Sequence, residues 1–168
     1  MRLFVAIELS PALCGALTEL QAALRRENVR GSYTPAENLH LTLAFLGEVP
    51  EAEPVLEAME TVDFAPFPLR LEGVGCFGDL FWAGVTESEA LAACARRLRR
   101  ALAEAGLPYD RKRFSPHITL LRRAVFREPP ALSPAPEEML VTRLTLLRSD
   151  RGKRGMIYTP LGSVPAQG

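Results

Sequence analysis

The segment NLHLTLAFLG (residues 38–47) alternates its side chains in the way that is typical of a β-strand, and it decides the fold. His40 and Thr42 are two residues apart and therefore point to one face of the strand. Leu41 and Leu43 point to the opposite face, which predicts that this face is buried. The imidazole and the hydroxyl either form a hydrogen-bonded pair inside a core or line a functional groove, and the segment alone leaves both open.

The only other histidine of the chain begins a second copy of the same pattern. His117 lies in SPHITLLR (residues 115–122), where Thr119 again follows at the second position and a leucine at the third. A chance match around both histidines is rare, so we interpret the pair as a motif. A repeated imidazole–hydroxyl face favours one shared groove over two separate core histidines.

The repeat extends beyond the two histidines, which are 77 residues apart. The same offset carries LFVA (residues 3–6) onto LFWA (residues 80–83) without a gap. It also brings a helix expected at 11–27 onto a helix expected at 87–105. Each half therefore consists of a strand, a helix, a polar or basic loop and a His-x-Thr strand.

Two equivalent halves naturally pair about a pseudo-twofold axis, which would bring the two His-Thr faces together. We therefore expect one domain over residues 1–168 with an internal duplication, its halves at roughly 1–76 and 77–168. Strands outnumber helices along the chain. The expected fold class is α+β, with two pseudo-symmetric lobes, each an antiparallel sheet flanked by helices, and the active-site groove between them.

Local signals predict the individual elements. Thr86 and Glu89 have the spacing of a capping box at the start of the third helix, and residues 31–35 are expected to form a loop. Residues 139–150 are expected to form a single strand. The other expected strands lie at 2–9, 38–47, 67–78, 80–85, 117–122 and 155–164, and the helices at 11–27, 50–62 and 87–105.

The composition predicts a compact soluble protein with an uneven charge distribution. The formal net charge is zero, but residues 1–95 carry 5 basic and 14 acidic side chains, whereas residues 96–168 carry 15 and 6. A basic half in a neutral chain favours an anionic ligand. Three cysteines without CxxC spacing predict free thiols in the cytoplasm, and no segment approaches the roughly 20 apolar residues of a membrane span.

Two histidines facing each other suit an in-line displacement at phosphorus. The attacking and leaving oxygens lie on opposite sides of the phosphorus, so the reaction needs one base and one acid, with donors for the oxygens between them. Imidazoles divide these roles near neutral pH, and threonine hydroxyls donate to the phosphate. Zinc sites generally need three or four protein ligands, so this residue set predicts a metal-free mechanism without a cofactor.

These motifs resemble those of the two-histidine (2H) phosphoesterases. Within that family the chain is similar to the bacterial and archaeal RNA 2′,3′-cyclic phosphodiesterases, also called 2′-5′ RNA ligase-like proteins. The resemblance runs from Arg2 to about Leu161 and rests on RLFVAIELS, TPAENLHLTLAFLGEV, LFWAGV and RFSPHITLLR, together with Ser149, Gly155 and Tyr158.

The resemblance implies a role for each motif residue. It implies that His40 is the proton donor to the leaving ribose oxygen and that His117 is the base that activates water. Thr42 and Thr119 are implied to hold the phosphate. The implied reaction opens a 2′,3′-cyclic phosphate at an RNA end, or in a related cyclic nucleotide, to a 2′-phosphomonoester.

Five further residues are candidates for substrate contacts. Arg122 extends the second motif strand and either reaches the phosphate or forms a structural salt bridge; its counterpart at the 77-residue offset is Phe45, a candidate RNA contact. Tyr33 stands where the family commonly has a tryptophan, and it or Phe114 either stacks on a terminal base or packs in the core. Arg113 lies in the basic loop before the second motif, where it would steer the RNA backbone.

Two alternative functions are compatible with the same residues. Ligation of RNA through a 2′-5′ linkage reverses a similar displacement, so the same acid and base would serve it. The third candidate is a non-catalytic module that binds RNA ends, which the presence of both histidines and both threonines disfavours. In each case the expected partner is RNA or a cyclic nucleotide rather than a membrane, and the protein is expected to be a monomer.

Overall fold

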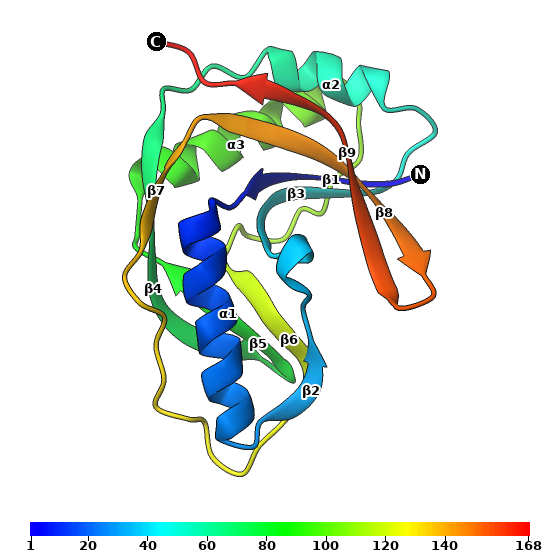
Figure 1. Cartoon of the computed structure of the whole chain (residues 1–168). Coiled ribbons are helices and arrows are strands. Elements are labelled where there is room, and N and C mark those ends of the chain that lie inside the picture. The colour runs from blue at the N-terminus through cyan, green and yellow to red at the C-terminus, as the bar shows by residue number, and fades with distance from the viewer.

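The computed structural model describes all 168 residues and contains three α-helices, one short 3-10 helix and nine strands (Figure 1). The helices are α1 (Pro11–Arg26), η1 (Ala36–Asn38), α2 (Glu53–Glu60) and α3 (Glu89–Glu104). The strands are β1 (Arg2–Glu8), β2 (Arg30–Tyr33), β3 (His40–Glu48), β4 (Phe67–Phe77), β5 (Leu80–Val85), β6 (Ile118–Val125), β7 (Glu138–Val141), β8 (Arg143–Gly152) and β9 (Gly155–Pro165). None of the helices is long and apolar enough to cross a membrane.

The strands form two antiparallel sheets, which confirms the predicted α+β class with two lobes. The first sheet has the order β3-β1-β8-β9 and the second the order β2-β6-β5-β4-β7. Each motif strand pairs with the strand that begins its repeat, β3 with β1 and β6 with β5. The two repeats therefore place one His-Thr strand in each sheet.

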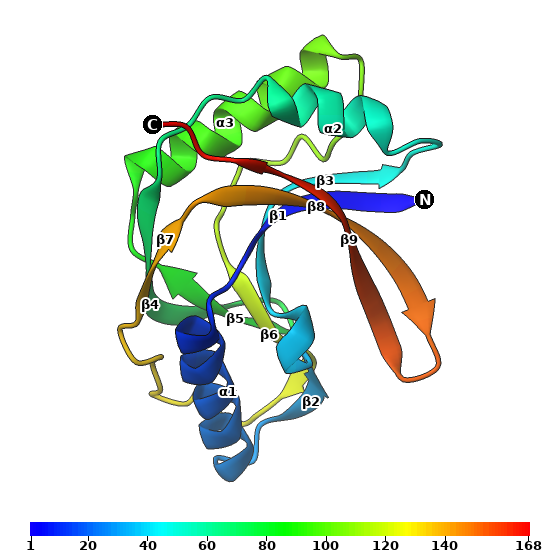
Figure 2. The ribbon, with the colours of Figure 1, turned by 45° about the horizontal axis from the view of Figure 1, so that its top comes forward.

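Each long helix leaves the sheet of its own repeat and packs against the other sheet. Helix α1 follows β1 but contacts β7 and lies over the second sheet, whereas α3 follows β5 and packs with α2 against the first sheet (Figures 1 and 2). Nε2 of Gln21 in α1 donates to the carbonyl of Leu120 in β6 at 2.9 Å. Nε of Arg99 in α3 donates to the carbonyl of Leu43 in β3 at 3.1 Å.

The alternation of the motif strands divides core from groove as the sequence predicts. Leu41 and Leu43 of β3 are fully buried in the main core. Ile118 and Leu120 are buried in the same way from β6. The intervening histidines and threonines are only half-buried, because they project from the opposite faces of the two sheets.

The prediction of a loop at residues 31–35 is wrong, because β2 extends over Arg30–Tyr33. This strand pairs antiparallel with β6, with Tyr33 opposite Leu121. Its sequence RGSY has no apolar alternation, since β2 is an edge strand whose side chains are mostly exposed. Pairing with a strand almost 90 residues later, rather than local hydrophobicity, makes this segment extended.

The single strand expected at residues 139–150 is also wrong. The chain changes sheets at Thr142, so β7 pairs with β4 in the second sheet and β8 pairs with β1 in the first. The apolar pattern continues across the break because Val141 and Leu144 both enter the common core. The spatial lobes therefore do not coincide with residues 1–76 and 77–168, and the duplication with those halves stays a prediction.

The strands expected at 67–78 and 80–85 pair as a hairpin that turns at Gly78 and Asp79, but the predicted capping box is wrong. Helix α3 is capped by Ser88, whose hydroxyl accepts a hydrogen bond from the Leu91 amide at 3.1 Å. A serine in this position satisfies one of the free amides of the first helical turn. The helix expected at 87–105 ends at Glu104, and Gly106 follows the C-cap with a φ of 71°, which suits a residue without Cβ.

Replacing Gln21 by methionine should lower the free energy of unfolding by about 1–3 kcal/mol, since it removes donors to two backbone carbonyls at nearly constant volume. Nε2 of Gln21 donates to Leu120 and Thr34 at 2.9 Å each, and the side chain is 4% exposed. Thr18→Ala is the matched control, because it removes a solvent-exposed hydrogen bond from the hydroxyl of half-buried Thr18 to the Gly15 carbonyl in the same helix. Urea denaturation measures the difference in stability. Equal unfolding midpoints for Gln21→Met and Thr18→Ala would contradict the claim.

Candidate active site

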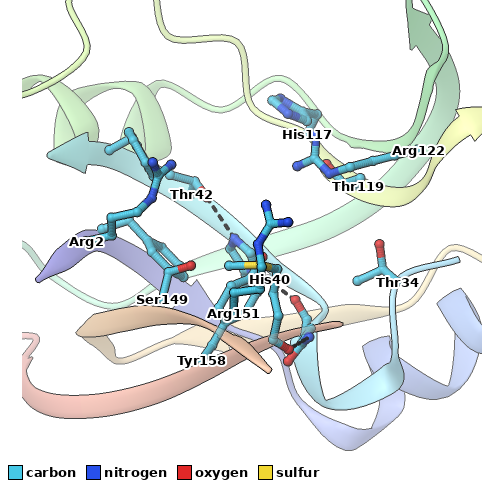
Figure 3. A pocket seen from close by; sticks show the side chains of 14 residues that line it. Arg2, Thr34, His40, Thr42, His117, Thr119, Arg122, Ser149, Arg151 and Tyr158 are labelled. Carbon is cyan, nitrogen blue, oxygen red and sulfur yellow. Dashed lines mark hydrogen bonds between the residues drawn. The ribbon is translucent and has the colours of Figure 1, made fainter. Parts of the chain in front are cut away.

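A cavity of about 520 Å³ lies between the two motif strands (Figure 3). Both histidines, both threonines and Arg122 line it, so the structure brings the central predicted residues together. In Figure 3, His117, Thr119 and Arg122 approach from the side opposite to His40 and Thr42. The full lining is Arg2, Phe4, Thr34, Asn38, His40, Thr42, Phe45, His117, Thr119, Arg122, Ser149, Arg151, Met156 and Tyr158.

Both nitrogens of His40 make hydrogen bonds within the site. Nδ1 lies 2.7 Å from the carbonyl oxygen of Asn38, and Nε2 lies 2.8 Å from Oγ1 of Thr42. A carbonyl only accepts, so Nδ1 carries a hydrogen and the neutral ring presents Nε2 as an acceptor for the Thr42 hydroxyl. Phe4 and Tyr158 hold the ring from two sides, with centroid separations of 4.9 and 5.3 Å.

His117 is held by an equivalent set of contacts. Its Nδ1 lies 2.7 Å from the carbonyl oxygen of Ser115, which is 77 residues after Asn38. The ring packs edge-on against Phe77 at 5.1 Å and near Trp82 at 6.3 Å. Both imidazoles are therefore fixed in the tautomer with Nδ1 protonated, which leaves Nε2 for chemistry in the cavity.

The cavity is cationic although the chain has no net charge. Arg2, Arg122 and Arg151 line it, and no aspartate or glutamate does. None of the three guanidinium groups is paired with a carboxylate. Arg2 instead lies over the ring of Phe45, with its central carbon 5.1 Å from the ring centroid. Such a cavity attracts a phosphate and repels cations.

The environment of His40 lowers the pKa of its imidazole below the ordinary value of 6.5. Burial is the largest cause because it disfavours the charged form, and the positive charges of Arg122 and His117 act in the same direction. The hydrogen bond from Nδ1 to the Asn38 carbonyl opposes them. Burial and the charges required for anion binding together make His40 a stronger acid.

Phe45 lines the cavity, but Tyr33 does not. The hydroxyl of Tyr33 donates to the carbonyl of Val29 at 2.7 Å, and the guanidinium of Arg25 lies over its ring at 4.0 Å. Its pairing in β2 places the next residue, Thr34, at the cavity instead. The structure therefore gives Tyr33 a structural environment outside the site.

Phe114 and Arg113 also lie outside the cavity lining. Phe114 is partly buried against the main core, and the guanidinium of Arg99 lies over its ring at 5.4 Å. Arg113 is exposed in the loop that precedes the second motif. Neither residue is brought to the phosphate-sized space between the histidines.

Several lining residues were not among the sequence candidates, including Arg2, Ser149 and Tyr158. Arg2 lies opposite Ser149 in the pairing of β1 with β8, and Ser149 lies opposite Tyr158 in the pairing of β8 with β9. Alternation from Glu8, which lies opposite His40, puts the even-numbered residues of β1 on the histidine face. This alternation assigns Arg2 to the histidine face, but only once the pairing of β1 with β3 is known.

The chain is similar to proteins of one family along most of its length. A model of the 2′-5′ RNA ligase superfamily matches residues 7–153. An RNA 2′,3′-cyclic phosphodiesterase from Thermus thermophilus is 35% identical over 100% of this chain and 91% of that protein. One from Geobacillus stearothermophilus is 36% identical over 71% of this chain, a match that covers only 41% of that longer protein. The crystal structure of Escherichia coli LigT with 3′-AMP superposes with a TM-score of 0.83 at 32% identity, covering 99% of this chain and 98% of that one.

The imidazole of His40 should titrate below pH 6.5 in the folded protein, as an NMR titration of its ring protons would measure. Arg122→Gln should move the midpoint upwards, because it removes a positive charge that disfavours protonation. The unfolded chain has the ordinary pKa, so protonation favours unfolding. The contribution of neutral His40 to stability is therefore full above pH 6.5 and is lost as the pH falls through the folded-state pKa.

The two histidine signals are assigned by comparing the His40→Ala and His117→Ala variants, each of which retains a single imidazole. A midpoint at or above 6.5 for His40 in the wild-type protein would contradict the proposed effect of burial and neighbouring charge.

Proposed function

This chain belongs to the 2′-5′ RNA ligase superfamily, and we propose that it hydrolyses 2′,3′-cyclic phosphate ends of RNA to 2′-phosphomonoesters. The observation that carries the proposal is the pair of imidazoles, each with Nδ1 on a backbone carbonyl, that line one cationic cavity. The names and full-length similarity of the relatives support the same activity.

The reaction follows from an acid and a base on opposite sides of phosphorus. Nε2 of His117 accepts a proton from water as the water oxygen bonds to phosphorus. The bond between phosphorus and O3′ breaks, and Nε2 of His40 donates its proton to O3′. The products are a free 3′-hydroxyl and a 2′-phosphomonoester, with one proton gained by His117 and one lost by His40.

Three residues are placed to hold the non-bridging oxygens of the phosphate. Thr42 and Thr119 project from the same strand faces as the histidines, and Arg122 lines the cavity beside Thr119. Thr42 already lies 2.8 Å from Nε2 of His40, so its hydroxyl and the acid reach neighbouring oxygens of one phosphate. The hydroxyl must leave Nε2 when the ribose oxygen arrives.

The lowered pKa of His40 fits its role as the acid once the substrate is bound. Arg122 and His117 disfavour the protonated ring in the free protein. A phosphodiester anion placed between these groups attracts the same proton and offsets their repulsion. The acid is then protonated where its proton is needed, and its low intrinsic pKa favours transfer to O3′.

The cellular setting is a further part of the proposal. We propose that the protein acts as a monomer in the cytoplasm and needs no cofactor or metal. The three cysteines are unpaired, which suits a reducing compartment. No cluster of three or more histidine, cysteine, aspartate or glutamate side chains is available for a metal ion.

Ligation of RNA through a 2′-5′ linkage is the second candidate function, and the name of the matching superfamily supports it. The same acid and base would serve a reaction in which a ribose hydroxyl takes the place of water. His117 is only half-buried, so water reaches it and competes with any hydroxyl nucleophile. Hydrolysis is therefore the reaction that the site favours.

An oligonucleotide with a 2′,3′-cyclic phosphate end should be converted to the 2′-phosphate in the presence of EDTA, as resolved by chromatography against both phosphomonoester standards. Protonation of O3′ by His40 determines which bond breaks. A second oligonucleotide with a free 5′-hydroxyl, added to the same reaction, tests for ligation. A 3′-phosphate product, or loss of activity with EDTA, would contradict the proposed chemistry.

His40→Ala and His117→Ala should each lower kcat by about two to four orders of magnitude, the usual contribution of a positioned acid or base. The double variant should lose far less than the product of the two effects, because both groups act in one displacement. Thr42→Val and Thr119→Val should cost about 10- to 100-fold by removing one donor to the phosphate. The hydrolysis rate of an oligonucleotide with a cyclic phosphate end is measured for all five variants.

Thr159→Val is the matched control for the threonines, since Thr159 is exposed on β9 and lies outside the cavity lining. Thermal melts should hardly change among the variants if the histidines face a groove. Full activity of His40→Ala, or large destabilisation with proportionate loss of activity, would instead indicate buried structural histidines.

A further inference from the structure

The hairpin of β8 and β9 extends beyond the sheet to which it belongs. Pairing between β1 and β8 ends where Arg2 lies opposite Ser149. Pairing between β8 and β9 continues to Gly152 and Gly155. Residues 150–157 therefore form a two-stranded ribbon with a free edge, and Figures 1 and 2 show it projecting beyond the other strands of the first sheet.

One face of this ribbon forms a wall of the active-site cavity. Arg151 and Met156 line the cavity, as do Ser149 and Tyr158 immediately behind them. The side-chain amide of Asn38 donates to the carbonyl of Met156 at 2.9 Å. The backbone carbonyl of Asn38 also accepts a hydrogen bond from Nδ1 of His40. Asn38 therefore contacts both the ribbon and the proposed acid.

The tip of the ribbon carries unpaired positive charge. Arg151, Lys153 and Arg154 are exposed, and no carboxylate lies within ion-pair distance of them. The one acidic residue of the ribbon, Asp150, is paired with Arg148 at 3.0 Å. Lys153 and Arg154 form the turn between Gly152 at the end of β8 and Gly155 at the start of β9, beyond Arg151, so the positive charge continues outward from the cavity to the tip.

The in-line geometry decides on which side of the phosphate the RNA lies, and this step rests on the proposed function. Water enters on the side of His117, and O3′ leaves on the side of His40. The ribose that bears O3′ therefore lies on the side of His40, whose ring contacts Tyr158 of β9. The nucleotides that precede the terminal ribose leave the cavity from that side.

We propose that the tip of the β8–β9 hairpin, through Lys153 and Arg154, binds backbone phosphates of the RNA strand upstream of the cyclic end. Single-stranded RNA carries a row of phosphates, which unpaired cations bind without regard to base sequence. The preferred substrate is then an oligoribonucleotide rather than a cyclic mononucleotide, because a mononucleotide has no upstream phosphate to reach the tip.

The test compares kcat/KM for 2′,3′-cyclic AMP with that for a hexanucleotide ending in a 2′,3′-cyclic phosphate. The wild-type protein should favour the hexanucleotide by about tenfold at low salt. Lys153→Gln with Arg154→Gln should remove most of this preference and leave turnover of cyclic AMP unchanged. It should also reduce the slope of log kcat/KM against log salt for the hexanucleotide by about 0.7 for each lost phosphate contact.

Arg96→Gln with Arg100→Gln is the matched control, because it removes two exposed charges from α3, which covers the face of the first sheet away from the groove. This pair should retain the preference. Lys112→Gln with Arg113→Gln removes two charges from the loop before His117. If only this double variant lost the preference for the hexanucleotide, the RNA would leave the cavity on the side of His117, and the proposal would be overturned.

Equal kcat/KM for the two substrates in the wild-type protein would also overturn the role of the hairpin while leaving the hydrolytic function intact. Absence of hydrolysis with both substrates would overturn the proposed function itself. Melting temperatures within a few degrees of the wild-type value establish that the charge variants are folded. Equilibrium binding of the 2′-phosphate product oligonucleotide supplies a readout that is independent of turnover.

Discussion

One hydrophobic core joins the two sheets, and a hydrogen bond from each long helix to a backbone carbonyl of a motif strand fixes that helix to the sheet of the other repeat. Gln21 bonds to Leu120, and Arg99 bonds to Leu43. The two carbonyls are 77 residues apart, like the two histidines. Because both helices cross to the other sheet, they bury the leucine faces of the motif strands together, and the histidine faces are left to meet across the groove.

A second, local constraint sets the tautomer of each histidine. Nδ1 of each imidazole donates a hydrogen bond of 2.7 Å to the backbone carbonyl of the residue two positions earlier in the chain. This local geometry arises at the start of each motif strand and needs no partner from elsewhere. The long-range packing of the sheets then only has to bring two Nε2 atoms to one cavity, which is why a short repeated motif suffices to specify an acid and a base.

The sequence predicts what is local or repeated and misses what depends on distant pairing. His40, His117 and their threonines follow from alternation and a constant offset. Tyr33 could not be placed, because β2 joins the sheet only through β6 and turns that ring towards Arg25. The change of sheet at Thr142 was likewise hidden, since the apolar pattern is continuous across it. The pairing of β1 with β8 leaves no local signal, so Ser149 entered only as part of the family resemblance and Arg2 was not placed at the site.

In the proposed mechanism, the charges that attract the phosphate also act on His40, the proposed acid. Arg122 attracts an anion into the cavity and, in its absence, disfavours protonation of His40. The bound anion reverses the balance, since its negative charge attracts the proton that the arginine repels. Occupancy and protonation are therefore coupled: the free protein holds His40 largely neutral near pH 7, and binding of the phosphodiester itself promotes protonation of the acid. A site with the same imidazoles but without the arginine would lose both anion affinity and this coupling.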